Sequence, residues 1–477
     1  MAQVSTHSPS RRGAAGWTLA VVSIALFMVT LDNLVVTTAL PSIRADLGAS
    51  LEALEWTVNA YTLTFAVLLP TGAALGDRFG RHRLFLAGLG IFTAASAFAA
   101  LAPDTGTLIA ARALQGVGAA IVTPLTLTLL SEAFPAERRG VALGIWSGIS
   151  GLGVAIGPLV GGAVVEGISW QWIFWLNVPV GLVLIPLAAR VLKPSYGPRR
   201  PLDLPGVALA SVGLLGVVYG VVRGNAAGWT SSEVLASLVA GAVALVAFLV
   251  WERHTSHPML PPRFFRSRAF SATNGVSLAM YFGMFGSIFL LAQFFQVVQG
   301  MSPLEAGLRT LPWTGMPMIV APIAGLLSDR IGSRPLMAAG LALQAGALAW
   351  IASITAPDLP YAEIIVPFVM AGTGMALVFA PAANAVLSAV RPEEAGQASG
   401  ATNAIREVGG VLGVAVLAAV FAGAGSYASP QSFVDGLVPA LSVGAAALAV
   451  GALVALLVPG RKRNAAPVAA AEATAAA

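Results

Sequence analysis

The chain has 477 residues, of which 57% are hydrophobic and only 10% charged, and its mean hydropathy is +0.83. This composition excludes a water-soluble globular protein, because too few polar side chains are available to cover its surface. No cysteine occurs, so disulfides, thiolate metal sites and thiol nucleophiles are excluded. The formal charge of +5 does not indicate nucleic acid, because the basic residues fall in short loops between apolar runs. The sequence therefore predicts an integral membrane protein.

Apolar runs of about 20 residues, the length that crosses a bilayer as a helix, follow one another along the chain. The first six cover residues 17–39, 54–75, 84–102, 107–130, 141–165 and 173–190. A further pair covers residues 204–222 and 233–251, and the last six cover residues 270–298, 305–327, 336–354, 362–388, 399–422 and 436–458. We therefore predict an all-α integral membrane protein with fourteen transmembrane helices.

The runs are grouped as two sets of six with two extra helices between them. We expect the following five segments: a cytoplasmic tail at 1–16, a six-helix bundle at 17–193, the inserted pair at 204–251, a second six-helix bundle at 268–459 and a disordered cytoplasmic tail at 460–477. The first run is too long for the apolar core of a signal peptide, so we interpret it as a retained helix.

An internal repeat supports this division. GDRFGRHR at 76–83 follows the second run, and SDRIGSRP at 328–335 follows the tenth. Parallel halves of this kind are typical of a transporter that rocks around a central site.

The distribution of arginine and lysine predicts the orientation. With a cytoplasmic N-terminus, nearly all basic residues of the loops lie inside, and only Arg44, Arg223 and Arg309 fall near outer loops. This bias satisfies the positive-inside rule. We expect both termini to be cytoplasmic in a bacterial inner or plasma membrane, where the chain functions as a monomer in contact with lipid.

Asp32 stands in the middle of the first run, in MVTLDNLVVTTALPSI at 28–43. An ionisable group at that depth costs about 3 kcal/mol or more and is usually kept for function. At about 1.5 Å per residue, Asp32 and Arg112 of the fourth run lie roughly 10 and 8 Å from the outer surface. We predict that they interact and that protonation of Asp32 is coupled to access. The alternatives are a contact of Asp32 to backbone or to hydroxyls such as that of Thr37, and snorkelling of Arg112.

Few other charges lie within the runs. Arg406 and Glu407 are sequence neighbours in the thirteenth run and point about 100° apart on a helix, so both cannot face one seam. Glu407 is a candidate second proton or cation site. Glu55 and Glu132 lie near helix ends, where we expect them at the interface. The four histidines are scattered and form no metal set, so we expect neither a metal nor a cofactor.

Aromatic and polar side chains on several runs are candidates for a substrate cavity. They are Tyr61, Gln115, Tyr281, Phe294 and Arg406. The aromatic members could stack on a large planar substrate, although packing in the core or against lipid is the commoner use of such residues.

The fifth run carries glycines with a spacing of four. Gly153, Gly157 and Gly161 fall on nearly one helix face, with Pro158 and Gly162 beside them. A face without side chains lets another helix approach closely.

The loop before the sixth run is rich in tryptophan. Trp170, Trp172 and Trp175 occur where an interfacial aromatic belt belongs, and anchoring is the default explanation.

Seven motifs occur in a fixed order along the chain. They are LDNLVVTTALP, GDRFGRHR, RALQGVGAA, GVAIGPLVGG, WQWIFWLNVPVG, SPLEAGLRTLP and REVGGVLGVAVL. In these motifs the sequence resembles the major facilitator superfamily, and within it the fourteen-helix drug:proton antiporters, over about residues 17–458. The family commonly has Arg between the two tryptophans of WQW, where this chain has Gln171, so an outer salt bridge is absent there.

The resemblance implies roles for two further sets of residues. Two repeated loops would form a conformational latch that uses Asp77, Arg78, Gly80, Arg81, Asp329 and Arg330. In this hypothesis Asp77 pairs with the neighbouring half only in the outward-facing state; the alternative is that the loop serves topology and helix capping. The glycine motif of the fifth run marks exporters rather than importers in the resembling family.

We therefore predict a proton-coupled exporter of amphipathic or aromatic drugs or secondary metabolites that works by alternating access and is not an enzyme. No GxxxxGK[ST] nucleotide motif occurs, so protons rather than a nucleotide would supply the energy. The alternatives are a proton-linked importer of the same fold and a membrane sensor that does not transport.

Overall fold

The computed structural model describes residues 11–197, 201–391 and 394–460, with some side chains of these ranges left undescribed. The predicted tails at 1–16 and 460–477 fall largely outside the described residues. Helices make up nearly all of the described chain. Those of the first half are α1 (Arg11–Leu47), α2 (Leu51–Phe79), α3 (Arg81–Ala100), α4 (Thr105–Ala133), α5 (Ala136–Gly167), α6 (Trp172–Trp175) and α7 (Asn177–Val191).

The inserted pair is α8 (Leu204–Ala227) and α9 (Ser232–His254), followed by the short 3₁₀-helix η1 (Phe264–Arg266). The second half contains α10 (Arg268–Gln293), the π-helical turn η2 (Phe294–Val298), α11 (Pro303–Thr314), α12 (Met316–Ile331), α13 (Ser333–Ile354), α14 (Tyr361–Ser388), α15 (Ala395–Ala424) and α16 (Pro430–Ala455).

The prediction of fourteen membrane-crossing helices is confirmed. Thirteen of the described helices or helix pairs are long and apolar enough to cross a membrane, and the described apolar part of α5 is Gly151–Gly167. Two of the crossings are each made of two consecutive helices, α6 with α7 and α11 with α12. The chain is therefore a multi-pass membrane protein.

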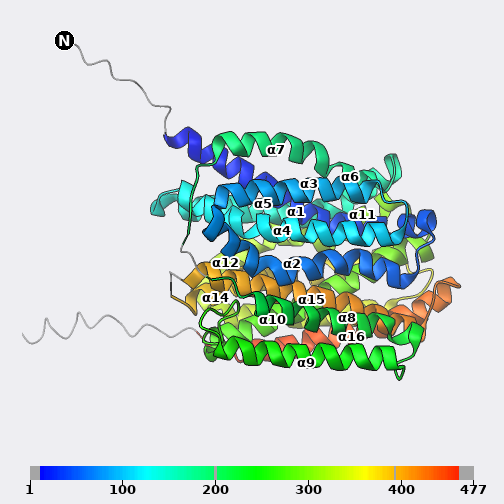
Figure 1. The fold of residues 1–477 in the computed structure, drawn as a ribbon. Helices are drawn as coiled ribbons and strands as arrows, with labels where there is room; N and C mark the ends of the chain where they lie inside the picture. The colour runs from blue at the N-terminus through cyan, green and yellow to red at the C-terminus, as the bar shows by residue number, and fades with distance from the viewer. Residues whose placement is uncertain (1–10, 198–200, 392–393, 461–477) are drawn as a thin grey trace, which may run out of the picture.

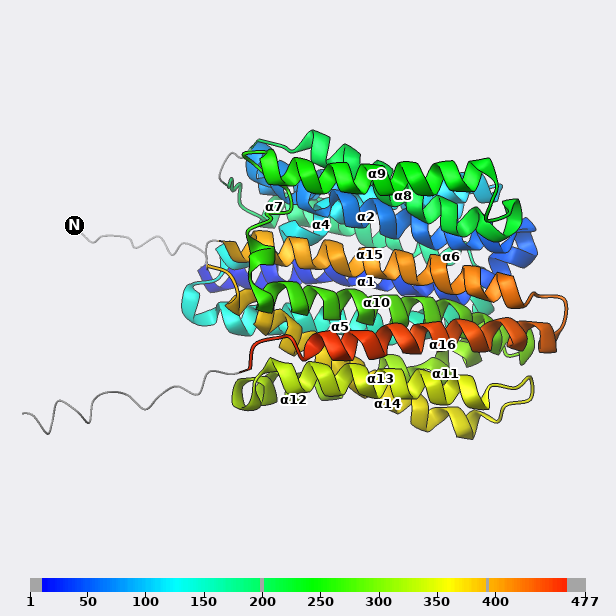
Figure 2. The same ribbon diagram turned by 90° about the horizontal axis from the view of Figure 1, so that it is seen from below.

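The crossings form two sets. In the first half α2 packs against α4, α3 against α4, and α1 against α5; in the second half α10 packs against α15, and α13 against α14 and α16. Figure 1 shows the first half above the second, with α9 along the lower edge. The beginning of α1 and the end of α16 lie at the same end of the molecule (Figure 2). We call this end the terminal face and the opposite end the far face.

Local sequence explains where the helices end. Ser50 and Asp104 cap α2 and α4, because their side chains accept hydrogen bonds from the backbone N–H groups of Ala53 and Thr107 at 3.2 and 2.8 Å. The repeated DRFG and DRIG stretches end α2 and α12. Their glycines, Gly80 and Gly332, have φ of +103° and +86°, which other residues rarely adopt.

The glycines of α5 allow it to lie directly against α1. A Cβ atom at Gly157 would lie 2.9 Å from Leu34 Cβ, and one at Gly161 would lie 2.8 Å from the Val35 carbonyl oxygen. The predicted close approach of another helix to this face is confirmed, and α1 is that helix.

Gly162, on another side of α5, faces the second half. A Cβ atom there would collide with the carbonyl of Pro303 in α11, and one at Gly307 of α11 would collide with the carbonyl of Pro158. The two halves therefore meet backbone to backbone along α5 and α11.

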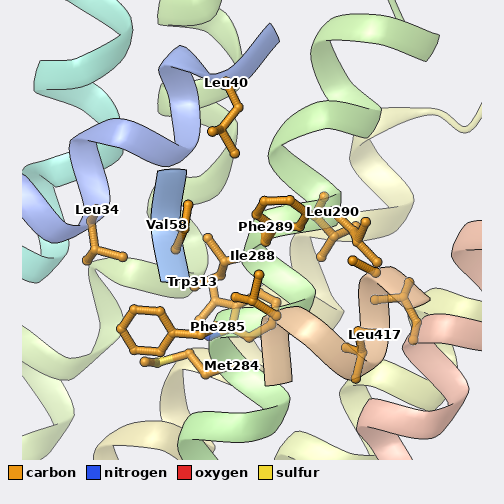
Figure 3. Close-up of a cluster of buried hydrophobic side chains, with 14 of the residues drawn as sticks. Leu34, Leu40, Val58, Met284, Phe285, Ile288, Phe289, Leu290, Trp313 and Leu417 are labelled. Atoms are coloured by element: carbon orange, nitrogen blue, oxygen red, sulfur yellow. The ribbon is translucent and has the colours of Figure 1, made fainter. Parts of the chain in front are cut away.

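Apolar packing closes the far face between the halves. In the close-up of Figure 3, Leu34, Leu40 and Val58 of the first half lie beside Phe285 and Phe289 of α10, within one buried cluster. The first half contributes to this cluster only through segments toward the far face. Toward the terminal face, α1 and one side of α2 pack in a cluster that contains only residues between 19 and 192 among those described, whereas Leu63 and Val67 of α2 pack with Val411 of α15. The conformation is thus sealed at the far face.

The inserted pair lies across the seam between the halves, where α8 contacts both α2 and α15. Arg223 near the end of α8 forms an ion pair with Glu52 of α2 at 3.1 Å, and Asn225 donates to the carbonyl of Ala419 in α15. At the terminal face, Trp251 Nε1 donates to Asp203 at 2.7 Å. The pair is therefore tied to both halves at the far end.

The close contact between α5 and α1 leads to the first prediction. Gly161→Ala places a methyl group against the Val35 carbonyl and Thr38. We expect it to destabilise the protein by about 1–3 kcal/mol, because relieving the clash requires a shift of the α1 backbone. Thermal unfolding of the purified protein in detergent measures this. The matched control is Gly148→Ala on the same helix, where a Cβ atom meets nothing within 4 Å. Equal melting temperatures for the two variants would contradict the packing argument.

Candidate functional site

The structure brings Asp32 and Arg112 together inside the first half. Asp32 of α1 and Arg112 of α4 are 2% and 0% exposed, and Arg112 Nη1 lies 2.5 Å from Asp32 Oδ2. The depth estimated from the sequence placed both at one level, as the structure does. Neither snorkelling of Arg112 nor a contact of Asp32 to the Thr37 hydroxyl occurs, because Thr37 donates to the Leu34 carbonyl instead.

Asp32 accepts two further hydrogen bonds from neutral side chains. Asn177 Nδ2 donates to Oδ1 at 2.7 Å, and Gln115 Nε2 lies 3.2 Å from the same oxygen. Gln115 Nε2 also lies 2.8 Å from the Ser96 hydroxyl, which connects α3 to the network. The network therefore surrounds the Asp32 carboxyl group with donors from α4 and α7.

Arg112 is bonded on several sides. Its Nε donates to the Thr57 carbonyl of α2 at 3.1 Å, and its Nη1 donates to Gln115 Oε1 at 2.9 Å. The guanidinium lies 4.3 Å from the centre of the Tyr61 ring and 5.7 Å from that of Phe174. A cation over an aromatic face is attracted by the negative potential of that face, and the attraction grows when water is excluded.

Glu407, the other predicted proton site, lies on α15 at the seam between the halves. It is half-buried, and its Oε2 atom is buried without a hydrogen-bond partner among the described atoms. Its charge interacts with Tyr61 of α2 and with Tyr281 of α10. Arg406 lies 5.9 Å from the Tyr281 ring centre and contacts Asn403 at 3.4 Å. Tyr61 thus stands between the Asp32 network and Glu407.

The remaining predicted cavity residues fall in different places. Tyr61 is fully buried, and its hydroxyl lies 3.4 Å from the Val29 carbonyl. Tyr281 is half-buried and stacks on Phe285 at 5.6 Å. Phe294 is fully buried against Phe295 and Phe433 toward the far face, so it belongs to the packed core in this conformation.

The predicted latch lies at the terminal face. Asp77 forms an ion pair with Arg81 of its own half at 2.6 Å, and Arg81 also pairs with Glu132 of α4. Gly80 makes the turn between them, and Arg78 is exposed. In the repeated loop Arg330 is exposed, whereas the side chain of Asp329 lies outside the described residues. Among the described residues, no hydrogen bond or ion pair joins Asp77 to the second half in this conformation, and the contact predicted for the outward-facing state stays a prediction.

Two expectations from the sequence are wrong. Glu55 is not at the interface: it is 3% exposed, whereas Glu132 is exposed as expected. Trp170 is not an anchor at the membrane surface either, because it is buried and donates to Asp46 Oδ2 at 2.7 Å. Gln171 also donates to Asp46. A hydrogen bond is therefore formed by the residue that replaces the family's arginine, where the sequence predicts that an outer salt bridge is absent.

Asn177 and Ser96 were missed as members of the site. Asn177 is the first residue of α7, and its side chain points inward to Asp32 and the Ser96 hydroxyl. The available signal was a single amide in the apolar stretch WIFWLNVPVG, because an unpaired amide within a membrane is costly.

Comparison with known proteins agrees with this architecture. The family described as Major Facilitator Superfamily matches residues 22–414. The chain is 40% identical to the cephamycin export protein of Amycolatopsis lactamdurans, covering 89% of this chain and 88% of that one. It is 38% identical to the puromycin resistance protein of Streptomyces alboniger, covering 92% and 89%. With the tetracenomycin C resistance and export protein of Streptomyces glaucescens it shares 34% identity, covering 91% and 81%.

Solved structures show the same fold. A peptide transporter POT in complex with sulfate superposes with a TM-score of 0.66 at 15% identity, covering 94% of this chain and 99% of the other. A POT family transporter in complex with a thioalcohol conjugated peptide gives a TM-score of 0.69 at 14% identity, covering 92% and 95%. The fold and the buried charge pair define a membrane transport protein of two helical halves. The chain belongs to the major facilitator superfamily.

The buried ion pair leads to the second prediction. Asp32→Asn leaves Arg112 without a counter-charge, and we expect it to destabilise the protein by about 3–5 kcal/mol. Adding Arg112→Met should recover part of that loss, because an apolar side chain needs no partner. Thermal unfolding in detergent measures both variants, with Asp435→Asn on the exposed end of α16 as a control. A double variant no more stable than Asp32→Asn would show that the pair does not act as a unit.

Proposed function

We propose that the chain is a proton-coupled exporter of amphipathic or aromatic small molecules. The observation that carries this proposal is the dehydrated Asp32–Arg112 pair, 2.5 Å apart, in a conformation sealed at the far face. An ionisable pair within a membrane protein is usually kept for proton or ion movement. The chain's own residues bind and release a proton, and no catalytic step is needed.

Protonation of Asp32 would break the pair. A neutral carboxyl group attracts the guanidinium far less than a carboxylate does, so Arg112 would then depend on Tyr61, Gln115 and the Thr57 carbonyl alone. Because Tyr61 also interacts with Glu407 of the second half, a change at Asp32 reaches the seam between the halves. This is the route by which proton binding would alter access to the central cavity.

The direction of transport is supported by two observations. Three relatives are named for export of, or resistance to, cephamycin, puromycin and tetracenomycin C. In addition, the α5 glycines seal α5 against α1 and against α11, which opposes leakage of ions along the seam. One proton moving inward supplies about 2.3 kcal/mol per 100 mV of membrane potential.

The arginines and lysines support the orientation. In the described chain the loops at the terminal face contain most of them, and the far face holds Arg44, Arg223 and Arg309. By the positive-inside rule the terminal face would be cytoplasmic. The far face would then be the outer side of a bacterial plasma membrane, and the sealed conformation would be inward-facing.

The third prediction is that a proton gradient drives export. In inside-out vesicles with an acidic interior, the wild-type protein should accumulate a fluorescent amphipathic aromatic dye. Asp32→Asn should reduce uptake to the rate seen without a gradient, because its amide does not titrate, while dye binding persists. Asp435→Asn serves as the control. An Asp32→Asn variant that accumulates dye at the wild-type rate would show that Asp32 does not couple proton movement to transport. Dye movement in the same direction as the proton would indicate an importer. Dye binding without proton flux would indicate a sensor.

The latch gives the fourth prediction. If Asp77 contacts the second half only in the outward-facing state, Asp77→Asn should favour the sealed, inward-facing state while changing the dye dissociation constant much less. The proportion of the two states can be measured by distances between spin labels at Pro103 and Asp358, exposed far-face residues of opposite halves. If the proportion of the two states is unchanged in Asp77→Asn, the loop serves only membrane topology and helix capping.

A further inference from the structure

Glu55 is a buried carboxyl group without a counter-charge. It lies one turn into α2, is 3% exposed, and its Oε2 atom has no hydrogen-bond partner among the described atoms. No described lysine, arginine or histidine forms an ion pair with it. Nothing in the roles proposed for Asp32, Arg112 and Glu407 uses it.

The position of Glu55 on α2 directs it toward the space between the halves. One side of α2 carries Tyr61, whose backbone would meet a Cβ atom at Gly116 of α4. The other side carries Leu63, which packs in one cluster with Val411 of α15. Glu55 and Asn59 lie on the face between these two sides at helical spacing. Asn59 is fully buried, and neither its side-chain oxygen nor its nitrogen has a described partner.

The second half approaches this face through Tyr427, in the loop before α16. The Tyr427 hydroxyl donates to Gln293 of α10, and its ring lies 3.6 Å below the guanidinium carbon of Arg44 in α1. The charge of Glu55 acts on Tyr427. Arg44 and Tyr427 therefore join the halves at the far face, on the side of the bundle where Glu55 and Asn59 hold buried polar atoms without described partners.

The charged and titratable groups around Glu55 are few. On its own helix Glu52 is the neighbouring charge, and Glu52 is neutralised by Arg223 of α8 at 3.1 Å. From α1 comes Arg44, which is engaged over the Tyr427 ring, and from the second half comes Tyr427 itself. None of the described groups supplies Glu55 with a cation in contact.

We propose that Glu55 is a proton-binding site that links closure of the far face to uptake of one proton from the outer side. An unpaired carboxylate loses its hydration when the far face closes, so the closed state requires the neutral acid, whereas the open state hydrates the ion. The inference rests on the proposed proton-coupled function and adds a second, outer site to it. It follows that a proton bound at Glu55 favours the return from the outward-open to the sealed conformation.

The sign of the pH dependence follows from linkage. The closed state binds one proton more than the open state, so raising the pH favours opening of the far face. In the range where Glu55 titrates, the open-to-closed ratio should rise by up to about tenfold per pH unit.

Spin-label distances test this in the purified protein without substrate or gradient. The chain has no cysteine, so Pro103→Cys and Asp358→Cys provide two unique labelling sites on opposite halves of the far face. In the otherwise wild-type protein, the longer, open distance should gain population from mildly acidic to mildly alkaline pH. In Glu55→Gln, whose amide mimics the neutral acid, the far face should stay closed and the slope due to this site should be lost.

The control is Glu363→Gln, an exposed carboxyl group in the first turn of α14 at the same face, which should keep the wild-type slope. Because other carboxyl groups can contribute to the slope, the comparison uses the difference between the slopes of the two proteins. A closed-state distance equal to that of wild type shows that Glu55→Gln is folded. A slope in Glu55→Gln equal to that of wild type overturns the proposal. Failure of dye export in vesicles would instead count against the proposed function and leave the distance result standing.

Discussion

The ion pair between Asp32 and Arg112 is the interaction on which the rest of the first half depends. Two charges removed from water are costly unless their other donors and acceptors find partners. Asp32 has such partners in Asn177 and Gln115, and Arg112 has them in Gln115, the Thr57 carbonyl and the Tyr61 ring, although Arg112 Nη2 is buried without a hydrogen-bond partner among the described atoms. These groups come from α1, α2, α4 and α7, so the four helices must keep one rotation and one depth. The charge pair therefore acts as a positional constraint, and its energetic cost explains why so many polar groups surround it.

The same constraint explains why the first half can move as a body. On one side α1 is held by the buried network, and on another it lies directly against the glycine face of α5, where a Cβ atom at Gly157 would lie 2.9 Å from Leu34 Cβ. Contacts of this kind have no flexible side chains to absorb a displacement. Motion is then left to the surfaces between the halves, along α5 with α11 and α2 with α15. The far face joins the halves mainly through the apolar cluster that contains Leu40 and Phe289, and its separation would also break the hydrogen bond from Gln296 Nε2 to the Thr38 carbonyl at 2.9 Å.

Much of this architecture could be predicted from the sequence, because hydropathy and spacing report helices and depth. The fourteen crossings, the repeated turns at Gly80 and Gly332, the glycine face of α5 and the common level of Asp32 and Arg112 all follow from positions along single helices. What could not be predicted depends on rotation and on tertiary partners. Asn177 joins Asp32 because α7 packs against α1, and Trp170 is buried where Asp46 accepts its N–H. Glu55 lies close to a helix end, where its sequence position favours the interface, and its burial depends on tertiary packing.

Asp32 and Glu55 differ in how much a relative movement of the two halves changes their surroundings. All hydrogen-bond and ion-pair partners described for Asp32 belong to the first half, so they move with it when the halves rock, and the pair is nearly indifferent to closure by itself. A group becomes sensitive to a conformational change only through contacts that differ between the two states. For Asp32 such a link is indirect, through Tyr61, which lies on Arg112 and within electrostatic range of Glu407 of α15. Glu55 instead lies on α2, which packs against α15 of the second half, and within electrostatic range of Tyr427, so closure itself changes its environment. A transporter with both arrangements can separate the event that closes the outer face from the event that rearranges the centre, because the two carboxyl groups respond to different movements.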